Sequence, residues 1–304
     1  MTSAAHDPAI DAARAGCSEA APRPDVAAFI DSDSNTISYI VSDPATRACA
    51  IIDSVLGFDA AAGRVTYPSV DILAGHVAAN GLTVDWLLET HVHADHLSGA
   101  TALRARTGGR ISIGSGVRDV DAAVGPLFDC SGSITAFDRL FEDGEQFAIG
   151  DLQATVLAVP GHTPACVAYA IGDALFCGDT MFMPDYGTAR CDFPGGDAGT
   201  LFRSVRRLLD LPSAMRVFVA HDYPTPARPD LAWETTIGAQ RADNIHVRDG
   251  TTEADFVAAR TARDATLAMP QLILPSIQVN LRAGGLPAPA ANGVRYLKLP
   301  LAQF

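Results

Sequence analysis

The chain has 304 residues, of which 48% are hydrophobic and 19% are charged, and its formal net charge is −13. This composition is typical of a folded globular protein, and the acidic balance argues against nucleic acid or an anionic membrane as the partner, because no basic face exists to neutralise phosphates. No apolar run approaches the roughly 18 residues of a membrane span, and the opening residues lack the apolar segment of a secretory signal, so we expect a cytoplasmic protein.

The first residues of the chain differ in composition from the rest. Residues 1–24 are rich in alanine and end in a Pro-Arg-Pro sequence, and we expect them to form a flexible tail. Apolar, β-branched runs then begin at Val26, Thr36 and Arg47, separated by turn-forming sequences. This pattern predicts an antiparallel meander of three strands.

The remaining chain alternates between helical and strand-like patterns. Helices are predicted at 70–80, 97–106, 200–211, 233–243 and 253–267, and strands at 84–90, 110–114, 145–150, 152–161, 166–172, 173–178 and 215–221. The segment 272–280 is predicted as a closing strand. Strands in runs interrupted by helices favour an α/β fold in which two packed sheets carry helices outside, a four-layer αββα sandwich. We expect a single domain over residues 25–304, with a C-terminal helical extension.

Residues that bind metals follow four of the predicted strands. They are His91, His93, Asp95 and His96 after the strand at 84–90, and His162, Asp179 and His221 after three later strands. Strand ends lie together along one edge of a sheet, and residues two apart in an extended segment point the same way, so His91 and His93 can share a cation. Imidazole and carboxylate suit Zn(II), Fe(II) or Mn(II). The other histidines, His6, His76 and His246, have no such context and are predicted to be ordinary surface or packing residues.

The motifs around these residues resemble the metallo-β-lactamase superfamily. The sequence THVHADH at 90–96 is followed in the family's order by GHT at 161–163, GDT at 178–180 and AHD at 220–222. The resemblance extends from about Val26 to the end of the chain. It implies an αββα sandwich with a metal site at one edge of the two sheets.

Within this superfamily the resemblance is compatible with two alternative kinds of metal site. In hydrolases such as hydroxyacylglutathione hydrolase, it implies two Zn(II) ions, one held by His91, His93 and His162 and the other by Asp95, His96 and His221, with Asp179 bridging. Such a pair lowers the pKa of bound water to about 7 and hydrolyses a thioester or lactone. In persulfide dioxygenases, it implies a single Fe(II) held by His91, His162 and Asp179. The other four residues would then orient ligands and waters.

The sequence around the ligands favours the dioxygenase. The residues Gly178-Asp179 with Arg190-Cys191-Asp192-Phe193 are similar to the dioxygenases' GD…R-x-D-F segment, and residues 220–223 match their AHDY. Residues 272–285 resemble their C-terminal strand, most of all in bacterial enzymes of sulfide detoxification. The resemblance implies oxidation of glutathione persulfide by O2 to sulfite and glutathione, with one Fe(II) per chain and a possible homodimer.

Two further residues are candidates for catalysis and substrate binding. Arg190 lies on the loop after a ligand strand, and its guanidinium matches the geometry of a carboxylate on an anionic substrate. The alternative is that Arg190 pairs with Asp192 or Asp185 and only shapes its loop. Tyr223 follows His221 and is expected to hydrogen-bond the ligands or the substrate, unless it is simply a half-buried aromatic residue at a strand end. A non-enzymatic sulfur sensor is a third interpretation, and the complete ligand set argues against it.

Overall fold

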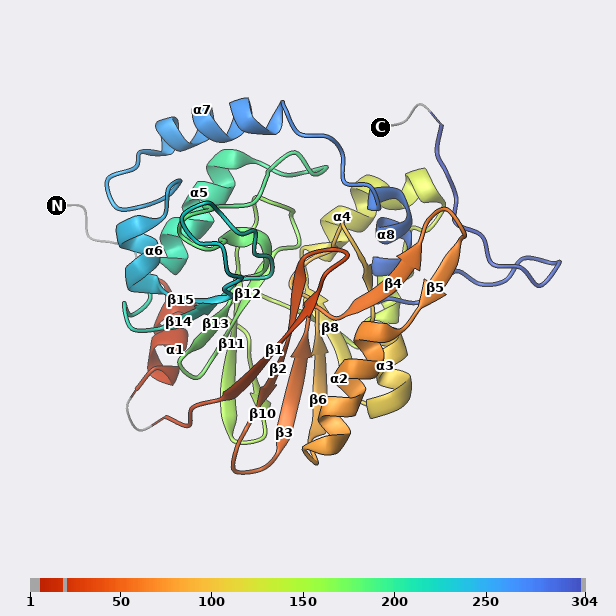
Figure 1. The fold of residues 1–304 in the computed structure, drawn as a ribbon, viewed down its shortest axis with the longest axis horizontal. Coiled ribbons are helices and arrows are strands. Elements are labelled where there is room, and N and C mark those ends of the chain that lie inside the picture. The colour runs from red at the N-terminus through yellow and green to blue at the C-terminus, as the bar shows by residue number, and fades with distance from the viewer. Residues whose placement is uncertain (1–5, 19–20, 302–304) are drawn as a thin grey trace.

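The computed structural model describes residues 6–18 and 21–301 and places two six-stranded sheets face to face (Figure 1). The first sheet has the order β1 (Asp25–Asp31), β2 (Thr36–Ser42), β3 (Ala48–Ile52), β6 (Thr83–Leu88), β8 (Arg110–Gly114) and β9 (Arg139–Phe141). Strands β1 to β3 form the predicted antiparallel meander. Strands β3, β6, β8 and β9 run parallel to one another.

The second sheet follows the first in the chain. Its order is β10 (Gln146–Ile149), β11 (Leu152–Ala158), β12 (Val167–Ile171), β13 (Ala174–Phe176), β14 (Arg216–Phe218) and β15 (Glu234–Thr236). Neighbours pair antiparallel except β13 and β14, which are parallel and are joined through helix α5 (Ala198–Leu208). A small third sheet has the order β5 (Arg64–Thr66), β4 (Val55–Asp59) and β7 (Leu97–Ser98).

Helices cover both outer faces, so the predicted αββα sandwich is confirmed. Beside the first sheet lie α2 (Pro68–Ala79), α3 (Ala100–Thr107), α4 (Val117–Val124) and α8 (Ile273–Asn280). On the side of the second sheet lie α1 (Pro8–Gly16), α5 and α6 (Ile237–Asp243), and α7 (Glu253–Asp264) packs on α5. Short 3-10 turns occur at η1 (Gly125–Phe128), η2 (Ser133–Ala136) and η3 (Gly178–Thr180). Among the described residues no helix is long and apolar enough to cross a membrane.

The sandwich follows from the period of two along each strand. In β2, Ile37, Tyr39 and Val41 face the core between the sheets, whereas Ile40 faces the helices of the first sheet. Alternate side chains of a strand point to opposite faces, so a fully apolar strand is stable only where both faces are covered. This explains why β2 and β3 are buried along their whole length.

The prediction of a flexible N-terminal tail is wrong for residues 8–16. They form α1, whose N-cap Asp7 accepts hydrogen bonds from the backbone of Ala9 and Ile10. Ile10 and Ala13 are buried against the second sheet. The alanines that suggested a tail are small residues with high helix propensity on the packed face of a helix. Residues 1–5 and 19–20, which belong to the same prediction, lie outside the described residues.

The predicted closing strand at 272–280 is also wrong, because this segment forms α8. Its buried residues include Ile273, Ile277 and Asn280, a helical spacing that the apolar β-branched composition obscured. Pro275 lies in the first turn, where its missing N–H leaves no hydrogen bond unmade. Two helices also begin later than predicted: residues 97–98 pair with β4 before α3, and residues 234–236 form β15 before α6.

Candidate metal centre

The seven predicted metal ligands come together at one edge of the sandwich. The segment with His91, His93, Asp95 and His96 follows β6 of the first sheet, while His162, Asp179 and His221 follow β11, β13 and β14 of the second. The ring of His91 lies 4.0 Å from that of His93 and 5.1 Å from that of His162, between centroids. The site therefore lies where the two sheets meet.

Three of these side chains form a group of donor atoms around a shared space. The ligand atoms of His91, His162 and Asp179 all lie within 4.8 Å of one another. From Asp179 Oδ2, the distances are 3.9 Å to His91 Nε2 and 3.7 Å to His162 Nε2. Two imidazoles and one carboxylate on a common centre form a donor set that zinc and non-haem iron sites both use.

A second group adjoins the first. The ligand atoms of His93, Asp95 and His96 also lie within 4.8 Å of one another. His221 Nε2 lies 3.5 Å from Asp95 Oδ2 and 3.4 Å from Asp179 Oδ1. Asp179 thus stands between the two groups, with Oδ2 toward one and Oδ1 toward the other.

Unpartnered buried atoms indicate that the site fits a cation. Among the buried side-chain atoms that have no hydrogen-bond partner within the described residues, four belong to predicted metal ligands: His91 Nε2, His93 Nδ1, His96 Nε2 and Asp179 Oδ1. Buried polar atoms are almost always hydrogen-bonded, and leaving one unpaired costs about 1–3 kcal/mol. A metal ion bound between these neighbouring side chains would give the unpaired nitrogen and oxygen atoms a partner.

In three of the histidines, the ring nitrogen that faces away from the site is hydrogen-bonded to a backbone carbonyl. His162 Nδ1 donates to the carbonyl of Arg190 at 2.7 Å, and His221 Nδ1 to that of Asn35 at 3.0 Å. His96 Nδ1 likewise donates to the carbonyl of Leu97 at 3.1 Å. A carbonyl can only accept, so the proton is on Nδ1 and the lone pair of Nε2 faces the site.

Two buried carboxylates behind the site were missed by sequence reasoning. His93 Nε2 lies 3.1 Å from Asp53 Oδ1 and 3.2 Å from Glu89 Oε2, so its Nδ1 faces the site. Asp53 also accepts from Thr90 Oγ1 at 2.8 Å, and that oxygen contacts His91 Nδ1 at 2.9 Å. Asp53 directly follows β3, just as the predicted ligands directly follow their strands. This position is the signal in the sequence that could have identified it.

The pKa shifts divide the ligands into two sets. Burial opposes protonation of His93 and His221, but neighbouring carboxylates raise the pKa of both imidazoles: Asp53 and Glu89 that of His93, and Asp179 and Asp95 that of His221. For three other ligands the shifts favour the metal-binding forms. Burial, reinforced by His93, lowers the pKa of His96 to about 4, and burial with the neighbouring imidazoles holds the pKa of His91 well below its ordinary value. Burial opposes ionisation of Asp95, but His96 and His221 lower the pKa of that carboxyl to about 2. Neutral imidazole and ionised carboxylate are the states that coordinate a cation.

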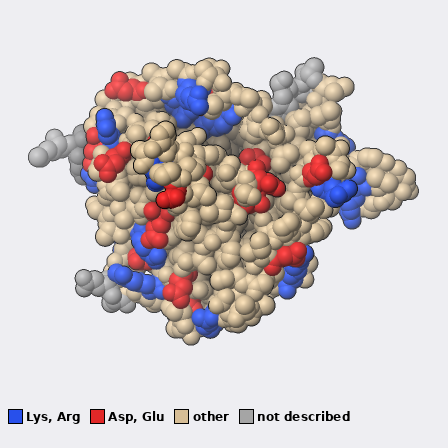
Figure 2. All heavy atoms as spheres, viewed as in Figure 1, with Lys and Arg blue, Asp and Glu red and all other residues tan. Residues whose placement is uncertain are grey.

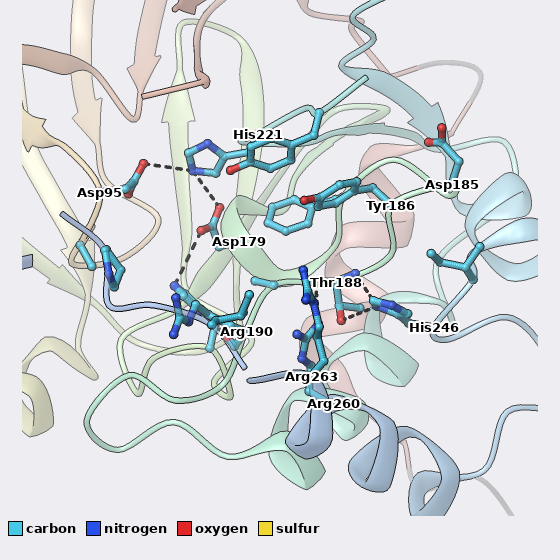
Figure 3. Close-up of a pocket in the computed structure, with 18 of the residues that line it drawn as sticks. Asp95, Asp179, Asp185, Tyr186, Thr188, Arg190, His221, His246, Arg260 and Arg263 are labelled. Carbon is cyan, nitrogen blue, oxygen red and sulfur yellow. Dashed lines mark hydrogen bonds and ion pairs between the residues drawn. The ribbon is translucent and has the colours of Figure 1, made fainter. Parts of the chain in front are cut away.

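A cavity of about 790 Å³ opens onto the metal centre. Asp95, Asp179 and His221 lie together at one end of it (Figure 3), and His162 also lines it. Tyr223 lines it too and stacks on Tyr186, with ring centroids 4.7 Å apart. Burial raises the pKa of Tyr223 above its ordinary value, so its hydroxyl remains a proton donor.

Arg190 lines the cavity, but its guanidinium is already paired. It makes a bidentate contact with Asp192 and donates to the carbonyl of Ala268 at 2.7 Å. Asp185, the other proposed partner, pairs with Arg228 instead. This arrangement corresponds to the loop-shaping alternative, whereas substrate binding by Arg190 stays a prediction.

His246, predicted to be an ordinary surface or packing residue, is partly buried and lines the same cavity. It is held there by residues of the loop after Asp179, since Thr188 N–H donates to His246 Nδ1 at 3.0 Å. Nothing in the sequence around His246 indicates this, because the contact spans 58 residues of chain.

Comparison with known proteins extends the likeness over most of the chain. The family model described as the Metallo-beta-lactamase superfamily matches residues 35–221. A probable metallo-hydrolase of Burkholderia pseudomallei (strain 1710b) is 51% identical, over 91% of this chain and 98% of its own length. Glyoxylase B2 of Dictyostelium discoideum is 47% identical, over 90% and 95%. The crystal structure of ETHE1 from Myxococcus xanthus superposes with a TM-score of 0.70 at 28% identity, over 86% of this chain and 100% of that one.

Proposed function

Because this chain belongs to the metallo-β-lactamase superfamily, we propose that it is a persulfide dioxygenase with one Fe(II) per chain. Its substrates are glutathione persulfide and O2, and its products are sulfite and glutathione. The proposal combines the group of His91, His162 and Asp179 with the dioxygenase-like sequences at 178–193 and 220–223.

The observation that carries the proposal is the donor set of that group. Two imidazoles and one carboxylate occupy one side of a metal and leave the remaining positions for two reactants. His162 and Asp179 also line the large cavity, so those positions are reached from it.

The reaction balances with water as the third reactant. Glutathione persulfide, O2 and water give glutathione, sulfite and two protons, and the terminal sulfur loses the four electrons that O2 gains. When bound, the iron supplies the electron transfer that activates O2. The chain's own residues fix the geometry: the carbonyls behind His162 and His221 orient the imidazoles, and the Tyr223 hydroxyl is a proton donor at the cavity wall.

A dinuclear zinc hydrolase, of the thioesterase or lactonase type, is the second candidate. The specific observation in its favour is the group of His93, Asp95 and His96 next to His221, which offers donors for a second ion. The names of two relatives, a probable metallo-hydrolase and a glyoxylase, are compatible with it. The two candidates differ in metal count and in the need for oxygen.

Metal analysis and an oxygen electrode separate the candidates. Protein purified without oxygen and loaded with Fe(II) should hold about one iron per chain and consume O2 when glutathione persulfide is added, with sulfite appearing in equal amount. The zinc-loaded protein should not hydrolyse S-lactoylglutathione. Two zinc ions per chain with oxygen-independent thioester cleavage would reject the dioxygenase in favour of the hydrolase.

A further inference from the structure

The far end of the cavity carries positive charge that the protein does not neutralise. Three arginines line the cavity: Arg190, Arg260 and Arg263. Arg190 is paired with Asp192 and Arg260 with Asp264, the latter at 2.6 Å. Arg263 has no carboxylate partner within the described ranges, and its guanidinium donates a 3.3 Å hydrogen bond to Thr266 Oγ1. In a chain of net charge −13, an unpaired guanidinium facing a cavity needs an explanation.

Arg263 is an exposed residue of α7 that lines the cavity, and the helix that carries it is anchored through its neighbours. Arg260, one turn earlier, is 6% exposed, and Asp264 accepts from both Arg260 and the backbone N–H of Cys191. These bonds tie α7 to the loop that carries Arg190. Figure 3 shows Arg260 and Arg263 rising from the helix into the cavity, and in Figure 2 basic side chains gather over α7.

His246 adds a neutral donor beside the arginines. Its Nδ1 accepts the backbone N–H of Thr188, so the ring proton is on Nε2. The imidazole is wedged against Gly187, where an added Cβ would lie 2.2 Å from Nδ1. The ring is therefore fixed by backbone contacts, and its N–H remains available to a ligand.

The cavity also continues past these residues. A smaller cavity of about 220 Å³ shares Ile245, His246, Arg260 and Arg263 with the large one. A ligand with its reacting atom at the metal centre can therefore extend along a basic wall. Arginine binds carboxylates in bidentate geometry, which a compact ammonium cannot do.

We infer that Arg263, together with Arg260 and His246, forms an anion subsite that binds a carboxylate of the thiol that carries the persulfide. This inference rests on the proposed function and names the class of carrier, a carboxylate-bearing thiol such as the glutathione tripeptide. The subsite lies away from the reacting sulfur, so it contributes to binding and not to the chemical step. Substrate binding by Arg190 is a separate prediction from this one.

The test compares Arg263→Gln with Arg263→Lys and with Arg118→Gln. Arg118 is an exposed arginine of α4 paired with Glu142, so its variant has the same change in net charge away from the cavity. Oxygen uptake by the iron-loaded protein is measured with glutathione persulfide and with cysteamine persulfide, which has no carboxylate. Binding of glutathione itself is measured by calorimetry under anaerobic conditions.

For Arg263→Gln we expect the KM for glutathione persulfide to rise about five- to tenfold, as for a partly exposed charged hydrogen bond, with kcat unchanged. The KM for cysteamine persulfide should stay within about twofold. Glutathione should bind Arg263→Gln correspondingly more weakly, Arg263→Lys to an intermediate degree, and Arg118→Gln as tightly as the original protein.

The subsite and the proposed function fail in different ways. Equal changes in KM for both persulfides, or unchanged glutathione binding in Arg263→Gln, would overturn the subsite while leaving the dioxygenase intact. If the original protein oxidises neither persulfide, the proposed function is rejected, and calorimetry still decides whether Arg263 binds a carboxylate. Failure of the original protein to bind glutathione also overturns the subsite.

Discussion

The side-chain amide of Asn280 donates a hydrogen bond of 2.9 Å to the backbone carbonyl of His93, across 187 residues of chain. The same amide donates to the carbonyl of His96 at 2.9 Å, and its oxygen accepts Ser98 N–H at 2.7 Å. One buried side chain of α8 therefore hydrogen-bonds the backbone at three points in and beside the segment that carries four predicted ligands. The C-terminal helix helps to shape the metal centre without contributing a ligand.

Replacing Asn280 by Ala should loosen that segment. Two buried carbonyls and one N–H lose their partner, and each such loss costs about 1–3 kcal/mol. We therefore expect the free energy of unfolding to decrease by at least about 3 kcal/mol. Urea denaturation and metal content measure the effect. Asn292→Ala, at an exposed position, is the control. Full metal retention in Asn280→Ala would show that the ligand segment holds its shape unaided.

Asp53 supports two imidazoles, His93 directly and His91 through Thr90. We expect Asp53→Asn to weaken metal binding about 10- to 100-fold, because the orienting acceptor of a ligand is impaired. Glu89→Gln should have a smaller effect, because Glu89 contacts His93 but does not support His91. Competition with a chelator measures the affinity, with the exposed Glu142→Gln as control. Equal affinities in all variants would contradict this role.

Metal content should distinguish the two groups of ligands. If one iron is held by His91, His162 and Asp179, His162→Ala should lose it while His221→Ala retains about one iron per chain. The reason is that removing one of three ligands abolishes a mononuclear site, whereas His221 contacts Asp179 from outside it. Elemental analysis of anaerobically purified protein gives the count. Loss of one of two metals in His221→Ala would indicate the dinuclear site.

Arg190 and Asp192 should behave as a pair. The backbone carbonyl of Arg190 holds His162 Nδ1, so we expect Arg190→Ala and Asp192→Ala to lower metal retention and kcat to a similar extent. The double variant should be no worse than either single one, because both remove the same contact. Steady-state oxygen uptake provides kcat and KM. A higher KM in Arg190→Ala with an unaffected Asp192→Ala would support the substrate-binding role predicted from sequence.

Four of the six cysteines should be inert toward alkylation. Burial raises the pKa of Cys49, Cys166, Cys177 and Cys191 to about 12. The reactive thiolate is therefore scarce at neutral pH. As long as the pH is below that pKa, each unit by which the pH rises makes the thiolate about tenfold more abundant. A mass-spectrometric time course with iodoacetamide at pH 7 and pH 9 should show Cys17, which is partly exposed, reacting first. Rapid labelling of any of the four at pH 7 would refute this.

Much of the fold was predictable because its signals are local. The apolar, β-branched runs of β2, β6, β11, β13 and β14 specify strands by their own composition. His91, His162, Asp179 and His221 could be placed at one edge because each follows such a strand. The errors at α1 and α8 arose where composition and tertiary packing disagree, since helix formation there is stabilised by burial of Ile10, Ile273 and Ile277.

The sequence by itself determined which side chains stand at the strand ends, and therefore that imidazoles and carboxylates suited to a metal gather at one edge of the sandwich. Only the tertiary structure decided what surrounds it: Asp53 and Glu89 behind His93, Asn280 on the ligand segment, Asp192 on Arg190, and Arg263 and His246 at the far end of the cavity. The physical reason is that strand periodicity is encoded in neighbouring residues. A hydrogen bond or an unpaired charge depends on which distant segments the packed sheets bring into contact.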